Sequence, residues 1–137
     1  MIMDYNAQFS DAQSAVTTAS ISSTNVLDTE VADSNVGSGT PIWVVCRVGT
    51  AFSGSGVLTV ALQDCATSGG TYVTRLTTAT LSLLECDAVG DDLLVTPLPS
   101  EHQRYLKLLY TNTHNSGAAG AIDAYLCLND PHALKTK

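Results

Sequence analysis

The sequence has few charged residues, and basic residues are the scarcest among them. Charged side chains make up 14% of the 137 residues, and six Lys and Arg stand against 13 Asp and Glu, which gives a net charge of −7. Binding to DNA or RNA depends on cations that neutralise phosphates, so nucleic acid repels such an acidic chain. Adhesion to anionic lipid needs polybasic segments for the same reason. We therefore expect no nucleic acid and no membrane among its partners.

Long hydrophobic runs are also missing. The longest purely apolar runs are short, such as Ile42 to Cys46, whereas a membrane-spanning helix needs about 20 residues. The N-terminal segment MIMDYNAQFSD lacks the basic stretch and the long apolar core of a secretory signal peptide. The sequence therefore predicts a protein that is made in the cytoplasm and has no membrane segment.

The four cysteines lack the spacing of a metal site or of a disulfide framework. Cys46, Cys65, Cys86 and Cys127 lie far apart, without a C-x-x-C or C-x-x-H motif. Zinc sites usually draw their ligands from such close pairs, and a reducing cytoplasm disfavours disulfides. We predict no metal and no cofactor. Cys46 and Cys127 fit the role of small buried hydrophobic residues.

A catalytic constellation is missing as well. The segment Gly54 to Gly56 is too short for the G-x-S-x-G elbow of a serine hydrolase. The histidines fall in predicted loops or in the tail, where solvated side chains are expected, and the acidic turn at residues 87–92 lacks the alternating spacing of a calcium loop. We expect no enzymatic activity and no catalytic residues. The side chains considered are His102, His114, His132, Asp87, Asp91 and Asp92.

The residues that are abundant favour β-structure. Ser and Thr together contribute 30 residues, 17 of them Thr, and the β-branched Thr is common on half-exposed strands. Hydrophobic residues reach 45%, which argues against a disordered chain. A chain of this length buries about two-thirds of its surface, enough for one domain with a single core. The composition therefore predicts one all-β domain.

Alternating hydrophobic residues identify the individual strands. In Val57 to Asp64, the side chains of Leu58, Val60 and Leu62 share one face, which is the period-two pattern of a strand with one side on the core. The same pattern places Leu106, Leu108 and Tyr110 on one face of a second strand, and Ile122, Ala124, Leu126 and Leu128 on one face of a third.

Further strand candidates fall at residues 41–48, 72–78, 81–84 and 93–98, and the segments between them are rich in Gly, Ser, Asn and Asp. These residue types favour turns. Because 41–48 is almost uniformly apolar, we expect it to be a central strand, whereas the Thr-rich 72–78 is expected to be more exposed. About seven or eight short strands separated by turns predict an antiparallel β-sandwich or barrel.

We divide the chain into an N-terminal arm (1–24), a β-sandwich domain (25–130) and a C-terminal tail (131–137). The arm lacks a clear helical pattern, so we expect it to be extended and to have low local stability. Its apolar side chains either cover the edge of the sandwich or dock on a partner. Docking predicts a partner interface made by Met1, Ile2, Met3, Tyr5 and Phe9.

One segment alternates basic and aromatic residues, from Arg104 to Leu108. Strands that bind nucleic acid can show this alternation, but two cations in a chain of net charge −7 support that reading weakly. Cross-strand pairing of Arg104 or Lys107 with acidic neighbours is the better interpretation.

Four stretches together resemble a family of tailed-phage proteins, the Bbp16-type capsid cement (decoration) proteins. The first is the N-terminal segment with Phe-Ser-Asp-Ala-Gln at residues 9–13. The second is Ser23 to Asp28, followed by a Gly-rich turn and the apolar strand 41–48. The third and fourth are Gly56 to Gln63 and Gln103 to Tyr110. Their order extends the resemblance over nearly the whole chain. The short loop from Cys65 to Gly70 and the basic tail depart from the family pattern.

The resemblance implies a single-domain, jelly-roll-like antiparallel β-sandwich with an extended N-terminal arm. It also implies a structural virion protein on the outer surface of the phage head. There it would bridge subunits of a major capsid protein with the HK97-like fold and stabilise the DNA-filled shell. A homodimer is favoured and a trimer is possible. The family has no active-site residues to carry over.

Two other functions stay open at this point. A phage tail or head-tail connector component is also all-β and oligomeric. A carbohydrate-binding β-sandwich module belongs to a different class, and it would present exposed aromatic side chains on one face. The single Trp of the chain, Trp43, lies in a strand that we expect to be central, so we predict it in the core instead.

Overall fold

The computed structural model describes residues 7–17, 19–30, 41–115, 118–128 and 131. Its strands run antiparallel in two sheets, and a short 3₁₀ turn, η2, lies between the seventh and eighth strands. In chain order the elements are β1 (Gln8–Ser14), β2 (Ser20–Ser22), β3 (Leu27–Asp28), β4 (Trp43–Ser53), β5 (Gly56–Cys65), β6 (Val73–Thr77), β7 (Leu81–Ser82), η2 (Leu83–Glu85), β8 (Asp92–Pro97), β9 (Tyr105–His114) and β10 (Ala119–Cys127).

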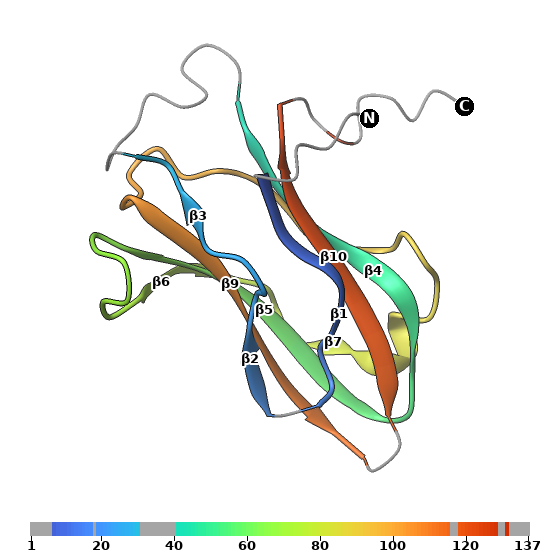
Figure 1. Ribbon diagram of the computed structural model, residues 1–137. Helices are drawn as coiled ribbons and strands as arrows, with labels where there is room; N and C mark the ends of the chain where they lie inside the picture. Colours follow the sequence, from blue (N-terminus) through green and yellow to red (C-terminus); the bar gives the residue numbers. More distant parts are fainter. Residues whose placement is uncertain (1–6, 18, 31–40, 116–117, 129–130, 132–137) are drawn as a thin grey trace.

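The strand order is that of a jelly roll. The first sheet has the order β1-β10-β4-β8 and the second has β2-β9-β5-β6, with β3 added beside β9 and β7 beside β5. Successive long segments of the chain therefore alternate between the sheets, and the first and last strands, β1 and β10, lie side by side (Figure 1). This arrangement confirms the expected all-β, jelly-roll-like sandwich and its single domain.

Tight turns make the short connections possible. Between β4 and β5, Gly54 and Gly56 adopt φ values of +91° and +143°, which residues with a Cβ atom rarely adopt. A Cβ atom on Gly56 would lie 1.8 Å from the backbone oxygen of Thr113. Glycine is therefore required for the close approach of β5 to β9 at this end of the sandwich.

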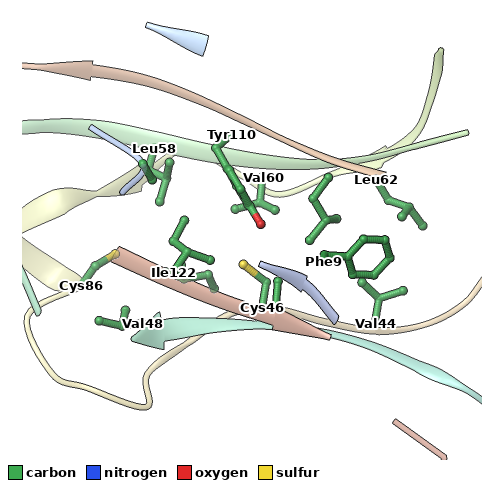
Figure 2. Close-up of a cluster of buried hydrophobic side chains, with 14 of the residues drawn as sticks. Phe9, Val44, Cys46, Val48, Leu58, Val60, Leu62, Cys86, Tyr110 and Ile122 are labelled. Atoms are coloured by element: carbon green, nitrogen blue, oxygen red, sulfur yellow. The ribbon is translucent and has the colours of Figure 1, made fainter. Parts of the chain in front are cut away.

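The core lies between the two sheets, and the alternating residues fill it as predicted. Leu58, Val60 and Leu62 of β5 are fully buried, and so are the matching side chains of β9 and β10. Figure 2 shows these side chains facing those of the opposite sheet, with the ring of Tyr110 reaching across the interior. Each buried aliphatic or aromatic side chain contributes about 1.5–3 kcal/mol relative to exposure. The fully buried partners on β9 and β10 are Leu106, Leu108, Tyr110, Ile122 and Ala124.

The N-terminal segment is part of the sandwich, which corrects the predicted arm at residues 1–24. Gln8–Ser14 pairs with β10 in the first sheet, and Ser20–Ser22 pairs with β9 in the second. Without β1 the jelly roll would lack its first strand. The Gln13 side chain links the two pieces, because its Nε2 donates to the backbone oxygen of Ser22 at 2.7 Å and its Oε1 accepts from the backbone nitrogen of Thr24 at 2.8 Å.

Two smaller expectations are also corrected. Trp43 is only partly buried, because it alternates with the core residues Val44 and Cys46 and so lies on the outer side of the first sheet. Leu128 follows the last residue of β10 and is 66% exposed, so the alternation stops one step earlier than predicted. Of the predicted tail at residues 131–137, all but Pro131 lies outside the described residues.

Candidate interaction surface

The predicted partner interface is only partly covered by the structure. Met1, Ile2, Met3 and Tyr5 lie outside the described residues. Phe9 is fully buried in the core between the sheets (Figure 2), so its assignment to a partner interface is wrong. Its side chain packs inside the sandwich because it points inward from β1, the strand that pairs with β10.

All three arginines of the chain form ion pairs with aspartates inside the molecule. Arg104, directly before β9, has its Nε 2.7 Å from Oδ1 of Asp28 on the neighbouring strand β3, which confirms the predicted pairing of Arg104 with an acidic neighbour. The hydrogen bond from Arg104 lowers the pKa of Asp28. The other two pairs are Arg47 with Asp92 and Arg75 with Asp64, each with 2.6 Å between Nε and a carboxylate oxygen.

Lys107 is different, because none of the ion pairs among the described residues includes it. Its ammonium group lies 4.1 Å from the ring centre of Tyr72 and 3.3 Å from Ser22 Oγ. Gln63 lies opposite Lys107 in the sheet and donates to Thr74 Oγ1. We call Tyr72, Thr74, Tyr105 and Lys107, on the outer face of the second sheet, the tyrosine–lysine patch.

The aromatic rings of this patch are partly covered by the protein's own cations. Lys107 lies over Tyr72, and the Arg104 guanidinium lies 5.1 Å from the ring centre of Tyr105. Cation–π contacts of this kind use the ring face that a sugar would stack on. The arrangement therefore weighs against a carbohydrate-binding module, even though two tyrosines lie on one sheet face.

A second unusual surface lies in the connection from β7 to β8. Leu84 and Val89 are 67% and 70% exposed. Burial raises the pKa of the Cys86 thiol in this connection, and the charges of Asp91, Glu85 and Asp87 raise it further. We call residues 84–91 the acidic loop. Its three carboxylates form no ion pair with any other residue that the structure describes.

The acidic loop is held firmly against β4. The backbone nitrogen of Phe52 donates to the oxygen of Cys86, and the nitrogen of Gly90 donates to the oxygen of Val48. The nitrogen of Val48 in turn donates to the oxygen of Asp91 at 2.9 Å. These bonds fix the backbone of the loop, so its exposed aliphatic side chains are presented in a defined position.

The edges of the two sheets differ in how open they are. The edge strand β1 carries a bulge around Ala12, whose φ is +44°, and the edge strand β8 ends at Pro97; both features hinder pairing with another strand. The strands β2 and β3 have only three and two residues. The edge strand β6 has five residues and a mostly exposed surface, with Val73 55% exposed. It is the most open edge.

A buried polar cluster lies where β5 meets the loop before β9. Asp64 is fully buried, and its Oδ2 accepts from Arg75 Nε and from the backbone nitrogen of Gln103 at 2.8 Å. Its Oδ1 meets no hydrogen-bond donor among the described residues. His102 is only 1% exposed, and its Nδ1 lies 2.9 Å from the oxygen of Gln103. The prediction of a solvated loop histidine is therefore wrong for His102.

The other predicted polar sites have different positions. His114 ends β9, is partly buried and contacts Asn112 through its ring, so it is not a loop residue. His132 lies outside the described residues. Within the described ranges, no group of three His, Cys, Asp or Glu side chains is placed to hold a metal ion. In the same ranges, no helix has the length and apolar character needed to cross a membrane.

The cysteines differ in burial. Cys46 is fully buried, as predicted, and burial raises the pKa of its thiol. Cys65 and Cys86 are also buried, whereas Cys127 is only partly buried. The prediction of a small buried hydrophobic residue therefore holds for Cys46 and fails for Cys127, which ends β10 near the rim of the sheet.

Sequence reasoning missed several residues of these surfaces. Leu84 and Val89 are aliphatic residues within an acidic turn, and that mixture is a readable signal of an exposed apolar contact. Asp64 continues the inward-facing series of Leu58, Val60 and Leu62 by one step, so the period-two pattern alone places it toward the core. Nothing in the local sequence indicates that Lys107 and Tyr72 meet, because Lys107 lies on β9 and Tyr72 lies 35 positions earlier, directly before β6.

The comparison with known families gives a match over most of the chain. The family described as Bbp16 matches residues 9–126, a range that begins at the buried Phe9 and ends in β10. No curated protein matches the sequence significantly.

Proposed function

Because the chain belongs to the Bbp16 family of phage-associated proteins, we propose that this phage structural protein is a capsid cement (decoration) protein. It would bind the outer surface of the phage head and bridge subunits of a major capsid protein with the HK97-like fold. The family match is the observation that carries the proposal. The rigid sandwich with exposed contact surfaces at several sides supports it, since bridging requires contacts at more than one place. The proposal assigns no enzymatic activity.

The physical basis of cementing is mass action. A protein that binds only the assembled shell stabilises that state, and a module with two contacts binds the second at a high effective concentration. Packaged DNA pushes the shell outward, so contacts across subunit boundaries oppose bursting. A net charge of −7 suits a position outside the shell, away from the DNA.

We expect phage heads that lack this protein to assemble but to burst at a lower temperature. The reason is that bridging contacts add to the barrier to bursting and are not needed for shell assembly. Release of DNA during heating, followed by a DNA-binding dye, measures the effect. Adding the purified protein back should restore the bursting temperature, and equal bursting temperatures with and without it would exclude a cementing role.

Copy number separates this function from its main alternative. A cement protein covers the shell and should be present in numbers comparable to the major capsid protein. A tail or head-tail connector component would form a low-copy ring at one vertex. Quantitative gel densitometry of purified virions against the major capsid protein distinguishes the two.

We also propose that the protein is a homodimer, with a trimer as the alternative, formed through the β6 edge. Across a two-fold axis, paired β6 strands would continue the second sheet.

Replacing the exposed Val73 with lysine places like charges near this axis and should convert the dimer to a monomer in sedimentation experiments. Val57→Lys, on the neighbouring strand β5 and 38% exposed, is the control. A wild-type protein that sediments as a monomer at micromolar concentration would rule out a dimer in solution.

A further inference from the structure

Two surfaces of this molecule complement each other and lie on different sides of it. The acidic loop carries three carboxylates without a described cationic partner and two exposed aliphatic side chains. The tyrosine–lysine patch carries Lys107, a cation without a described carboxylate partner, over the ring of Tyr72. We propose that the acidic loop of one copy docks on the tyrosine–lysine patch of a neighbouring copy. This inference rests on the proposed cement function, which brings many copies side by side.

The chemistry of the two surfaces is matched group by group. An ammonium group has three N–H donors; the described contacts of Lys107 are the Tyr72 ring and Ser22 Oγ, which leaves a donor for a carboxylate of the incoming loop. The aliphatic side chains of Leu84 and Val89 would cover the exposed parts of the tyrosine rings. Such a contact removes apolar surface from water on both copies.

Both surfaces are rigid before they meet. The acidic loop is bonded to β4 through its backbone, and the patch residues lie on β9, on β6 and directly before β6, on both sides of the inner strand β5. Binding therefore needs little ordering of either partner, which lowers its entropic cost. It also explains why exposed aliphatic residues are held away from the core, next to the buried Leu83 and Cys86.

The positions of the surfaces fix the symmetry of the contact. Figure 1 shows η2 and the acidic loop on the side of β4 that faces away from β6. A contact between different surfaces of two copies is heterologous, so it links copies head to tail into rings or chains. The patch uses the face of the second sheet, whereas the proposed dimer uses its β6 edge. Both contacts can therefore form at once, and together they would join cement copies laterally over the shell.

Chemical cross-linking between two kinds of chain tests the proposal. One chain carries Val89→Cys and the other Thr74→Cys, both in a Cys127→Ser background, because the remaining cysteines are buried. The two are mixed, bound to cement-free heads and treated with a short bismaleimide. We expect a mixed cross-linked pair, which a size tag on one chain distinguishes from pairs of like chains. The Val89→Cys chain alone should give no pair, whereas a pair from the Thr74→Cys chain alone reports only the proposed β6 dimer. Val26→Cys, at a residue 47% exposed on another part of the surface, replaces Val89→Cys as the control and should give little product.

Charge-reversal substitutions provide a second test of the head-to-tail contact. Lys107→Glu on the Thr74→Cys chain should reduce the cross-link about tenfold, since like charges face each other at the contact. Asp87→Lys on the Val89→Cys chain should then restore it. Melting temperatures close to wild type show that both chains are folded.

The outcomes separate the inference from the proposed function. If wild-type protein does not bind the heads, the cement function fails. If it binds but the mixture gives no more cross-link than the Val26→Cys control, the head-to-tail contact is wrong. If Asp87→Lys abolishes binding to the heads and the parent pair gives no cross-link, the acidic loop contacts the major capsid protein, and the proposal is overturned.

Discussion

Phe9→Ala is expected to lower the free energy of unfolding by about 3–5 kcal/mol, as large-to-small substitutions of buried aromatic residues do. Phe9 is fully buried and packs among core residues of both sheets (Figure 2). The loss is a large fraction of the roughly 5–15 kcal/mol that stabilises a typical domain. Urea denaturation followed by circular dichroism measures it, with the slope of the transition checked for two-state behaviour.

Two controls separate core packing from partner docking. Val89→Ala removes an aliphatic side chain that is 70% exposed, so its effect should stay within about 0.5 kcal/mol. Deleting residues 1–6 removes Met1, Ile2, Met3 and Tyr5 but keeps Phe9, and so tests the predicted docking of these four residues separately from that of Phe9. If Phe9→Ala leaves stability unchanged and instead abolishes binding to phage heads, Phe9 is a docking residue after all.

The regular strands could be predicted because their signal is local. In β5, β9 and β10 hydrophobic side chains alternate over several residues, and one buried face is enough to produce that pattern. Leu58, Leu108 and Ile122 lie in the core where the alternation places them. The turns are local as well, because the positive φ values of Gly54, in the turn before β5, and of Gly56, the first residue of β5, require glycine at these positions. The strand order, however, was expected from the family resemblance and not from the alternation.

The first strand could not be predicted, because its burial depends on distant residues. Phe9 is surrounded in sequence by Gln8, Ser10 and Asp11, which show no alternation of apolar residues. Ser10 is nevertheless fully buried, because its hydroxyl lies 2.7 Å from that of Tyr110 on the opposite sheet. A polar residue buried by a partner 100 positions away leaves no mark in its own neighbourhood. The burial of His102 has the same origin, since it follows from how its loop packs against the end of β5.

The exposed surfaces of the candidate interface are even harder to predict from the sequence than the first strand. Periodicity reports which side of a strand faces the core, but it does not report which exposed residues of neighbouring strands meet. Lys107 and Tyr72 approach each other only because β9 and β6 flank β5 in the sheet. The exposure of Leu84 and Val89 depends on the backbone bonds that fix their loop on β4. Contacts between distant residues and the exposure of loop side chains can therefore be seen only in the tertiary structure.

Asp64 and Arg75 form the ion pair whose disruption should cost the most. Asp64 is fully buried at the end of the inward-facing row of β5, and its Oδ2 lies 2.6 Å from Arg75 Nε on the edge strand β6. The same oxygen accepts from the backbone nitrogen of Gln103. One carboxylate thus ties together β5, β6 and the loop before β9. Removing its cation leaves a charge inside the protein with one described hydrogen bond to satisfy it.

Arg75→Ala should therefore lower the free energy of unfolding by about 3 kcal/mol, the lower end of the range for breaking a buried pair, because the Arg75 side chain is 34% exposed. In an Asp64→Asn background the same substitution should cost far less, since the neutral amide can still accept from Gln103 and no charge is left unpaired. This double-mutant cycle, measured by urea denaturation, isolates the coupling between the two side chains.

Arg104→Ala is the matched control. It breaks a pair on the same sheet whose side chains are both 40% exposed, and solvent screening should make its effect much smaller. Equal losses for Arg75→Ala in both backgrounds would show that the guanidinium stabilises β6 by packing alone, and that the buried carboxylate does not depend on it.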